Sequence, residues 1–562
     1  MSFSKKNSLQ LILVAAGLII LNLASNYIYK RFDLTQDKRY TLSEASKEII
    51  YDADSPIIID VFLEGNFPPE FQKLKTETKQ LLEEFKSHNS NISFEFLNPL
   101  EGEENPEAIK SQLFQLGIKP AQVAVQENGK TTTELVYPWA LAYYNEKTVK
   151  IPLLVNQLGA TSPERVNASI QNLEYAFTDG FNKLLHPKEK KIAILKGNGE
   201  LEDRNIADFL KTIGEYYRIA PFTLDSVAKT PQRTNTQLKE YDLVVVAKPT
   251  DAFTDSEKYV LDQYTMSGGK SLWLFEQTTT KIDSINGDTY VFPKDLNLND
   301  LFFKYGLRVN ANLVKDVYSA PITLASGTEN ESQYNQYPWF LSPLTASGSN
   351  HPIVTNIEAV KFDKASAIDT LPNSIKKTIL LSTSPLSKKV GLPFQIDFDK
   401  EIPENLKVVN EGPKPSEFDG GEIPLAVLLE GKFESVFKNR IKPFKLSVDK
   451  TESVATQMIV ISDGDIIKNQ FDRNRPLELG FDKLTNTFYG NKEFLLNCIN
   501  YLLDDDGLIN IRSKEISIPF LDPQKTAQNR NTWQILNLLL PLGLLAVFGI
   551  VFQYLRKRKY TR

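Results

Sequence analysis

The apolar stretch at residues 533–555 constrains the fold of this 562-residue chain more than any other feature. A membrane-spanning helix needs about 20 mostly apolar residues. This stretch is longer than that and carries no charged side chain. Trp533 and Tyr554 lie near its two ends, where aromatic side chains are enriched at membrane interfaces, and Pro541 is tolerated inside a span. The sequence therefore predicts a transmembrane helix over 533–555.

A second, shorter apolar run lies at residues 9–28, directly after Lys5 and Lys6. One interpretation is a signal peptide that is removed after export. Ala24 and Ser25 make a poor cleavage site, however, and the residues that follow continue the apolar run. We therefore expect an uncleaved membrane anchor, preceded by a short N-terminal segment at residues 1–8.

The basic residues at the C-terminus predict the orientation of the chain. Cytoplasmic ends of membrane spans are enriched in lysine and arginine, and residues 556–562 contain Arg556, Lys557, Arg558 and Lys559. Two spans make an even number of crossings, so both termini are expected in the cytoplasm. The residues between the spans would then lie outside the inner membrane, in the periplasm of a bacterium with two membranes.

The charge distribution agrees with a division of the chain between compartments. The chain has a net charge of −5. Residues 1–29 carry +2 and residues 533–562 carry +5, so residues 30–532 carry −12. An acidic body argues against a general nucleic-acid-binding protein. The single cysteine, Cys498, excludes an intramolecular disulfide and every CxxC motif.

The first part of the exterior region, residues 30–186, predicts a β-α-β domain. A β-branched strand at 57–63 is followed by a helix from Pro68 to about residue 87 and a strand at 92–99. The arrangement resembles half of a thioredoxin-like domain, but the missing CxxC motif excludes the redox role. Further strands are expected at 121–126, 133–137 and 148–154, and a helix at 165–185.

A proline and a charge run at 187–191 predict a domain boundary, and residues 187–515 predict a second, α/β domain. Its apolar strands alternate with helices, which indicates a parallel, doubly wound sheet with both faces covered. An Asn-, Ser- and Thr-rich insertion of weak periodicity is expected at 281–375, and a stalk at 516–532. The expected elements are strands at 192–195, 241–249, 271–275, 377–385, 424–433 and 456–467, and helices at 203–216, from Thr254 onward and at 490–503.

The sequence Gly268-Gly269-Lys270-Ser271 has the form of a phosphate-binding loop, but its surroundings indicate a turn. Thr254 and Glu257 form a capping box that begins a helix, and the glycines lie where this helix must end. A phosphate loop has the opposite order, with the strand before the loop and the helix after it. The chain therefore has no nucleotide site here, and any ATP must be hydrolysed by another protein.

Few residues predict a functional site. Gly197, Asn198, Gly199 and Glu200 follow a strand of the α/β domain, where doubly wound sheets bind ligands, so this loop is a candidate ligand contact and equally a plain turn. Cys498 lies in an apolar helix stripe and is expected in the core. The three histidines are too scattered for a metal site. The aspartates at 463–465 and 504–506 are expected to cap turns. We predict no catalytic residue, metal or cofactor.

Four segments stand out: RFDLTQDKRYTLSE (31–44), LLEGKFESVFKNR (428–440), VISDGDIIKNQF (460–471) and LELGFDKLTNTFYGNKEFLLNCINYLLDDDGLINIRSKE (477–515). Together they resemble the GldG family of gliding-associated ABC-transporter auxiliary proteins of Bacteroidota. The resemblance implies an accessory subunit that works with separate permease and ATPase subunits in the inner membrane. It also implies a GIFT domain, which is related in fold to glutamine-amidotransferase-like domains. The family supplies no established catalytic residues.

Three functions follow as hypotheses. The first is a non-catalytic, doubly anchored auxiliary subunit of an ABC transporter, since two spans without ionisable residues cannot form a transport pathway. The second is a tethered module that captures a substrate between its two exterior domains. The third is a hydrolase or amidotransferase, for which the chain offers no suitable cysteine.

Overall fold

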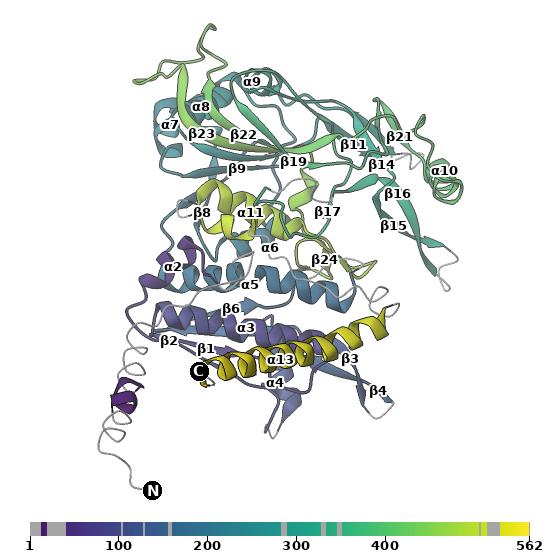
Figure 1. Cartoon of the computed structure of the whole chain (residues 1–562). Helices are drawn as coiled ribbons and strands as arrows, with labels where there is room; N and C mark the ends of the chain where they lie inside the picture. The colour runs from purple at the N-terminus through teal and green to yellow at the C-terminus, as the bar shows by residue number, and fades with distance from the viewer. Residues whose placement is uncertain are drawn as a thin grey trace. The chain divides into compact units, whose positions relative to one another are not determined.

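The computed structural model describes two compact units, residues 1–515 and 516–562 (Figure 1). The predicted N-terminal span at 9–28 lies mostly outside the described residues, as do Lys5 and Lys6. Within that span, residues 13–18 are helical and exposed. The described residues are 13–18, 41–102, 105–127, 130–155, 160–282, 289–326, 333–345, 351–504, 507–513 and 529–560.

The predicted β-α-β unit is confirmed within a four-stranded sheet of order β2-β1-β5-β6. Strand β1 (Ile57–Val61) pairs in parallel with β2 (Ile92–Phe96), and α3 (Pro69–His88) connects them. On its other side β1 pairs antiparallel with β5 (Trp139–Tyr144), which the sequence did not predict. Strand β6 (Lys147–Pro152) completes the sheet.

Two predicted strands of this region form a hairpin of their own. Strand β3 (Ala121–Glu127) pairs antiparallel with β4 (Lys130–Val136) and with no strand of the four-stranded sheet. Only residues 137 and 138 separate β4 from β5. The two strands therefore look like one run in the sequence, which explains why β5 was missed.

Three phenylalanines hold two long helices together. Helix α5 (Ser162–Leu185) packs against α3. The ring of Phe85 meets that of Phe181 edge to face at 5.1 Å, and Phe177 lies 6.2 Å from Phe181. All three rings are fully buried, as their helical spacing predicts.

The sequence did not predict two short helices of this region. Helix α2 (Glu44–Tyr51) begins at the cap Ser43, and α4 (Pro106–Gln115) begins at the cap Asn105. Each spans at most three turns, and α4 buries only Leu113. Helices of this length show too little apolar periodicity to be identified by pattern.

The second sheet has seven strands in the order β19-β22-β23-β10-β9-β7-β8 (Figure 1). The five strands from β8 to β23 are parallel, and β22 and β19 pair antiparallel. The predicted wholly parallel sheet is therefore wrong at one edge. The strands are β7 (Lys191–Lys196), β8 (Arg218–Thr223), β9 (Leu243–Ala247), β10 (Lys270–Leu274), β19 (Lys376–Ser382), β22 (Pro424–Glu434) and β23 (Glu452–Ile461).

The antiparallel edge has a physical reason in the connection between β22 and β23. A parallel pair needs a crossover long enough to return the chain to the starting edge, usually a helix. Residues 435–451 join β22 to β23 and contain no helix or strand. The chain therefore turns back beside the strand that it has just left.

Helices cover both faces of this sheet (Figure 1). All five residues of β9 are buried, as its apolar sequence predicts. Cys498 is fully buried in α11, and burial raises the pKa of its thiol well above the usual range, so its expected core position is confirmed. One face packs against α6 (Ala207–Ile213) and α11 (Asn491–Leu503), and the other against α7 (Pro231–Leu238) and α8 (Asp255–Met266).

The insertion at 281–375 contains more regular structure than its sequence suggested. It consists mainly of short antiparallel pairs, several with partners far away in the chain. Such strands pack against each other and carry little local periodicity. The elements of this region and of the segment after it are β11 (Thr278–Ile282), β12 (Thr289–Pro293), α9 (Asn299–Tyr305), β13 (Leu307–Val309), β14 (Leu313–Asp316), β15 (Ser319–Ser326), β16 (Gln333–Thr345), β17 (Val360–Lys361), β18 (Ile368–Thr370), β20 (Ser387–Val390), β21 (Phe394–Ile396) and α10 (Phe398–Glu411).

The Gly-Gly-Lys-Ser segment is a helix stop, as predicted. Both hydrogen bonds of the capping box at Thr254 are present, and α8 ends at Met266. Gly268 follows with a φ of +97°, and a Cβ atom on Gly269 would lie 2.3 Å from the ring of Tyr264. Strand β10 begins at Lys270, so the order is helix, turn and strand.

Gly268→Ala is expected to lower the free energy of unfolding by about 1–2 kcal/mol, because a side chain disfavours positive φ. The new methyl group would also lie 2.8 Å from Val454. Urea denaturation of the full chain in lipid nanodiscs measures the change. Gly391→Ala is the control, since a Cβ atom there meets no atom within 4 Å. Equal losses in both variants would contradict the assignment of Gly268 as a helix stop.

A buried arginine joins three helical segments of the first unit. Arg512 lies in η4 (Leu508–Ser513) and is 4% exposed. Its Nη2 atom lies 2.6 Å from Oε1 of Glu493 on α11, and it also donates to the carbonyl oxygens of Thr355 and Asn356. The guanidinium lies 4.8 Å from the ring centre of Tyr175 on α5. Arg512 thus connects α5 with α11.

The second unit contains the predicted C-terminal span. Helix α13 (Arg530–Tyr560) includes Pro541 and begins near Trp533. Among the described residues, it is the one helix long and apolar enough to cross a membrane, and the most apolar 18-residue stretch within Arg530–Arg558 has a mean hydropathy of 2.5. The basic residues Arg556, Lys557, Arg558 and Lys559 lie at its C-terminal end.

Candidate functional site

The loop predicted to contact a ligand lies at a change of direction in the sheet order. Gly197, Asn198, Gly199 and Glu200 follow β7, whose neighbours are β8 on one side and β9 on the other. Ligands of doubly wound sheets bind beyond the carboxyl ends of the strands at such a point. Gly197 and Gly199 have positive φ angles of 116° and 71°.

The space beside this loop is filled by the chain after β9. The carbonyl oxygen of Asn198 accepts hydrogen bonds from the backbone amides of Thr250 and Asp251, at 2.9 and 3.0 Å. A Cβ atom on Gly199 would lie 1.9 Å from Oγ1 of Thr250. Burial raises the pKa of Glu200. None of the four cavities described for the chain is lined by residues 197–200, so ligand contact at this loop stays a prediction.

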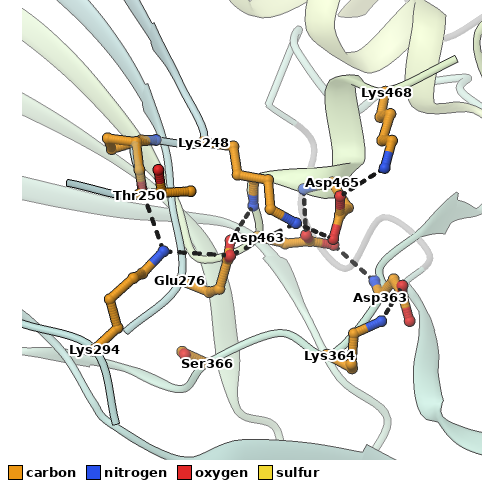
Figure 2. A network of polar contacts seen from close by, with 12 residues as sticks. Lys248, Thr250, Glu276, Lys294, Asp363, Lys364, Ser366, Asp463, Asp465 and Lys468 are labelled. Carbon is orange, nitrogen blue, oxygen red and sulfur yellow. Dashed lines mark hydrogen bonds and ion pairs between the residues drawn. The ribbon is translucent and has the colours of Figure 1, made fainter. Parts of the chain in front are cut away.

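A group of charged side chains gathers instead at the carboxyl ends of β9, β10 and β23 (Figure 2). Lys248 follows β9, Glu276 follows β10, and Asp465 follows β23. The Nζ atom of Lys248 pairs with Asp465 and lies 3.7 Å from Oε1 of Glu276. We call the whole group the strand-end network; it comprises Lys248, Glu276, Lys294, Asp363, Lys364, Asp463, Asp465 and Lys468 (Figure 2).

The insertion contributes the other three residues of the strand-end network. Lys294 lies 3.5 Å from Glu276 and donates to the carbonyl oxygen of Pro249 at 3.1 Å. The backbone amide of Asp363 donates to Oδ2 of Asp463 at 2.7 Å, and Lys364 pairs with the Asp363 carboxylate. The network therefore fastens the insertion to the end of the sheet.

The two aspartates after β23 have opposite protonation tendencies. Burial raises the pKa of Asp463 well above the usual range, and the carboxylates of Asp465 and Glu276 raise it further. Burial also acts to raise the pKa of Asp465, but Lys248, Lys364 and Lys468 hold it below the usual range. Asp463 therefore retains a proton over a pH range in which Asp465 is ionised.

This difference predicts a pH-dependent stability. Because the folded pKa of Asp463 is raised, its stabilisation is complete below the ordinary value of 3.8 and is lost as the pH rises toward the folded value. The loss amounts to at most about 1.4 kcal/mol per pH unit. Asp463→Asn cannot titrate at this position. The free energy of unfolding of the wild type, measured relative to that of Asp463→Asn, should therefore fall as the pH rises. Denaturation at pH 4.5, 6 and 7.5 measures it, and a constant difference would contradict the prediction.

A cavity of about 950 Å³ opens beside the strand-end network. Its volume is in the range of sites for small ligands. The charged part of its wall includes Lys248, Asp363, Lys364, Asp463, Asp465 and Lys468, and the apolar part includes Pro321, Ile322, Trp339, Phe362, Ile396, Phe398, Phe471, Phe481, Leu484 and Tyr489. An apolar wall with a few fixed charges is suited to binding a small molecule.

The sequence pattern of Asp463-Gly464-Asp465 predicted a capped turn and did not indicate the network. The turn is confirmed, since Oδ1 of Asp463 accepts a hydrogen bond from the amide of Asp465 at 2.7 Å. A usable signal was present: Lys248, Glu276 and Asp463 each follow an apolar strand within two residues. The carboxyl ends of parallel strands meet at one edge of the sheet, so these residues could have been grouped together. The ion pairs between these residues could not have been predicted from the sequence.

One of the comparisons with known proteins points to transport. A family model described as "ABC-type uncharacterized transport system" matches residues 189–498, more than half of the chain and the whole strand-end network. A model of a domain of unknown function matches residues 36–143. An uncharacterized protein of Borreliella burgdorferi (strain ATCC 35210) is 22% identical over an alignment of 543 residues, and the match covers 94% of this chain and 94% of the relative.

One solved structure, titled "mmIFT52 N-terminal domain", is similar at 14% identity. The match covers 56% of this chain and 99% of the solved chain, with a TM-score of 0.32. A likeness this slight carries no argument about the fold. The GIFT-type and amidotransferase-like assignment therefore stays a prediction.

Proposed function

We propose that this chain, which belongs to the family of ABC-type uncharacterized transport systems, is a non-catalytic auxiliary subunit that works with separate permease and ATPase subunits. The observation that carries the proposal is the joining of a family-matched α/β region to α13, a helix long and apolar enough to cross a membrane. The Gly-Gly-Lys-Ser segment is a helix stop, so the energy of ATP would come from the partner ATPase.

The proposed topology has both termini in the cytoplasm and residues 30–532 in the periplasm. The basic residues at the end of α13 support it, together with the predicted span at 9–28. A reporter active only in the cytoplasm should work after Arg562. A reporter active only in the periplasm should work after Ile441, which is 96% exposed in the loop between β22 and β23. The reverse pattern at either position would refute the topology.

We propose two exterior domains, a thioredoxin-like one at 30–186 and a doubly wound, GIFT-like one at 187–515 with its insertion at 281–375. The two family models end and begin on either side of the boundary at 187, which supports this division. The stalk at 516–532 would connect the second domain to α13. The Borreliella relative aligns over 94% of both chains, which supports the same order of domains in the two proteins.

The resemblance to the GldG family further supports a role in gliding. The proposal predicts that deletion of this chain's gene abolishes gliding in its host and that the full-length chain restores it. A deletion strain that glides normally would remove the motility role. The transporter role would stand, because it is tested separately by co-purification.

A second candidate function, substrate capture, is favoured by the cavity beside the strand-end network. The sequence analysis expected capture between the two exterior domains. All residues that line the cavity lie between Lys248 and Asn491, within the family-matched region. The captured molecule would therefore bind inside the second domain.

A further inference from the structure

The charges on the cavity wall divide into paired and available groups. Lys248 pairs with Asp465, Lys364 with Asp363, and Lys361 with Asp482 at 2.9 Å. In each pair the carboxylate offsets the charge of the lysine, so the lysine attracts an anionic ligand only weakly. These lysines are therefore poor contacts for a ligand.

Two other lysines on the wall remain available. Lys468 is exposed, and its closest carboxylate oxygen, on Asp465, lies 3.9 Å away. Lys483 is also exposed, and its Nζ atom donates to the carbonyl oxygen of Phe471 at 2.8 Å. Among the described residues, no carboxylate lies within ion-pair distance of Lys483. An ammonium group has three donors, so both lysines keep donors for an anion.

The chain folds these two lysines toward the same part of the wall. The backbone amide of Lys483 donates to Oε1 of Gln470 at 3.1 Å, and Gln470 is two residues from Lys468. Both lysines border the same cavity. A single anionic group on a small ligand can therefore be bound from this side.

The rest of the cavity wall includes aromatic side chains, and part of it is exposed. Trp339 and Phe398 have ring centres 5.3 Å apart, and Phe471 and Phe481 also line the cavity. Phe398 is 41% exposed and Leu484 is 52% exposed. Covering such side chains removes apolar surface from water, which stabilises a complex. The wall thus suits an aromatic or branched aliphatic group.

We infer that the cavity binds a small organic anion, whose acidic group contacts Lys468 and Lys483 and whose aromatic or branched aliphatic body packs against Trp339 and Phe398. The inference rests on the capture function proposed above and names its ligand class. The auxiliary role in the transporter does not depend on it.

Three probes with one ring system test the inference: 1-naphthylacetate, its neutral amide, and the cationic 1-naphthylmethylamine. Each is titrated by ligand-observed NMR against the full chain in lipid nanodiscs, with empty nanodiscs as the blank. The anion should bind about tenfold or more tightly than the amide, since a charge-assisted hydrogen bond is clearly stronger than a neutral one. Lys468→Gln with Lys483→Gln should remove that preference.

Lys229→Gln is the control, because Lys229 is exposed and lies outside the cavity wall. It should leave the affinity for the anion unchanged. Equal binding of all three probes, or tighter binding of the amine, would overturn the anion assignment and leave substrate capture standing. Binding of none of the probes would overturn the inference and count against capture in this cavity, whereas the auxiliary role would be unaffected.

Discussion

Arg512→Met is expected to lower the free energy of unfolding by about 3 kcal/mol or more. The substitution removes the 2.6 Å contact with Glu493 and leaves the carbonyl oxygens of Thr355 and Asn356 without this donor. Removing the buried arginine is costly because the carbonyl oxygens that lose its donor stay desolvated, whereas the Glu493 side chain is 32% exposed. The cation–π contact with Tyr175 is lost as well.

Urea denaturation of the full chain in nanodiscs measures the effect of this substitution. Hydrogen exchange should locate it in α5, η4 and α11, the three segments that Arg512 connects. The matched control is Arg475→Met, since Arg475 is exposed in β25 (Arg475–Pro476) and a surface change costs at most about 0.5 kcal/mol. If the two variants lose the same stability, Arg512 does not connect these helices.

Asp465→Asn is expected to cost about 3–5 kcal/mol, the range for breaking a buried ion pair from one side. Lys248 would then remain in the strand-end network with Glu276, at 3.7 Å, as its nearest carboxylate. The carboxylate of Asp465 also raises the pKa of Asp463, so that pKa should fall in the variant.

A double-mutant cycle separates this ion pair from general damage to the turn. Lys248→Met combined with Asp465→Asn removes both charges and should cost less than Asp465→Asn alone, because no unpaired buried charge remains. The free energies of unfolding of wild type, Lys248→Met, Asp465→Asn and the double variant give the coupling energy. A double variant that is no more stable than Asp465→Asn would show that the pair contributes little.

The central strands of the second sheet could be predicted from the sequence because burial on both faces leaves a direct trace. Strand β9 is apolar throughout, and the glycines after α8 mark where the helix ends. The antiparallel edge and the strands of the insertion could not be predicted in the same way. Thr289 of β12 pairs with Ile396 of β21, for example, and no local pattern encodes a partner so far along the chain.

The site was predictable only in its general position. The rule that ligands bind beyond the carboxyl ends of strands correctly directed attention to that edge of the sheet, but it selected the loop after β7. The cavity lies instead beside the ends of β9 and β23. Lys248 and Asp465 are 217 residues apart, and their contact depends on the order β23-β10-β9. Only the folded sheet brings them together.

The auxiliary role is tested most directly by purifying the tagged full chain from its native membranes in mild detergent. The account predicts that a permease and an ATPase co-purify in a fixed ratio, and that the assembly hydrolyses ATP whereas the separated chain does not. An unrelated apolar span in place of residues 533–555 serves as the control for contacts made by α13. Recovery of the chain alone as a stable monomer, or ATP hydrolysis by the chain itself, would contradict the account.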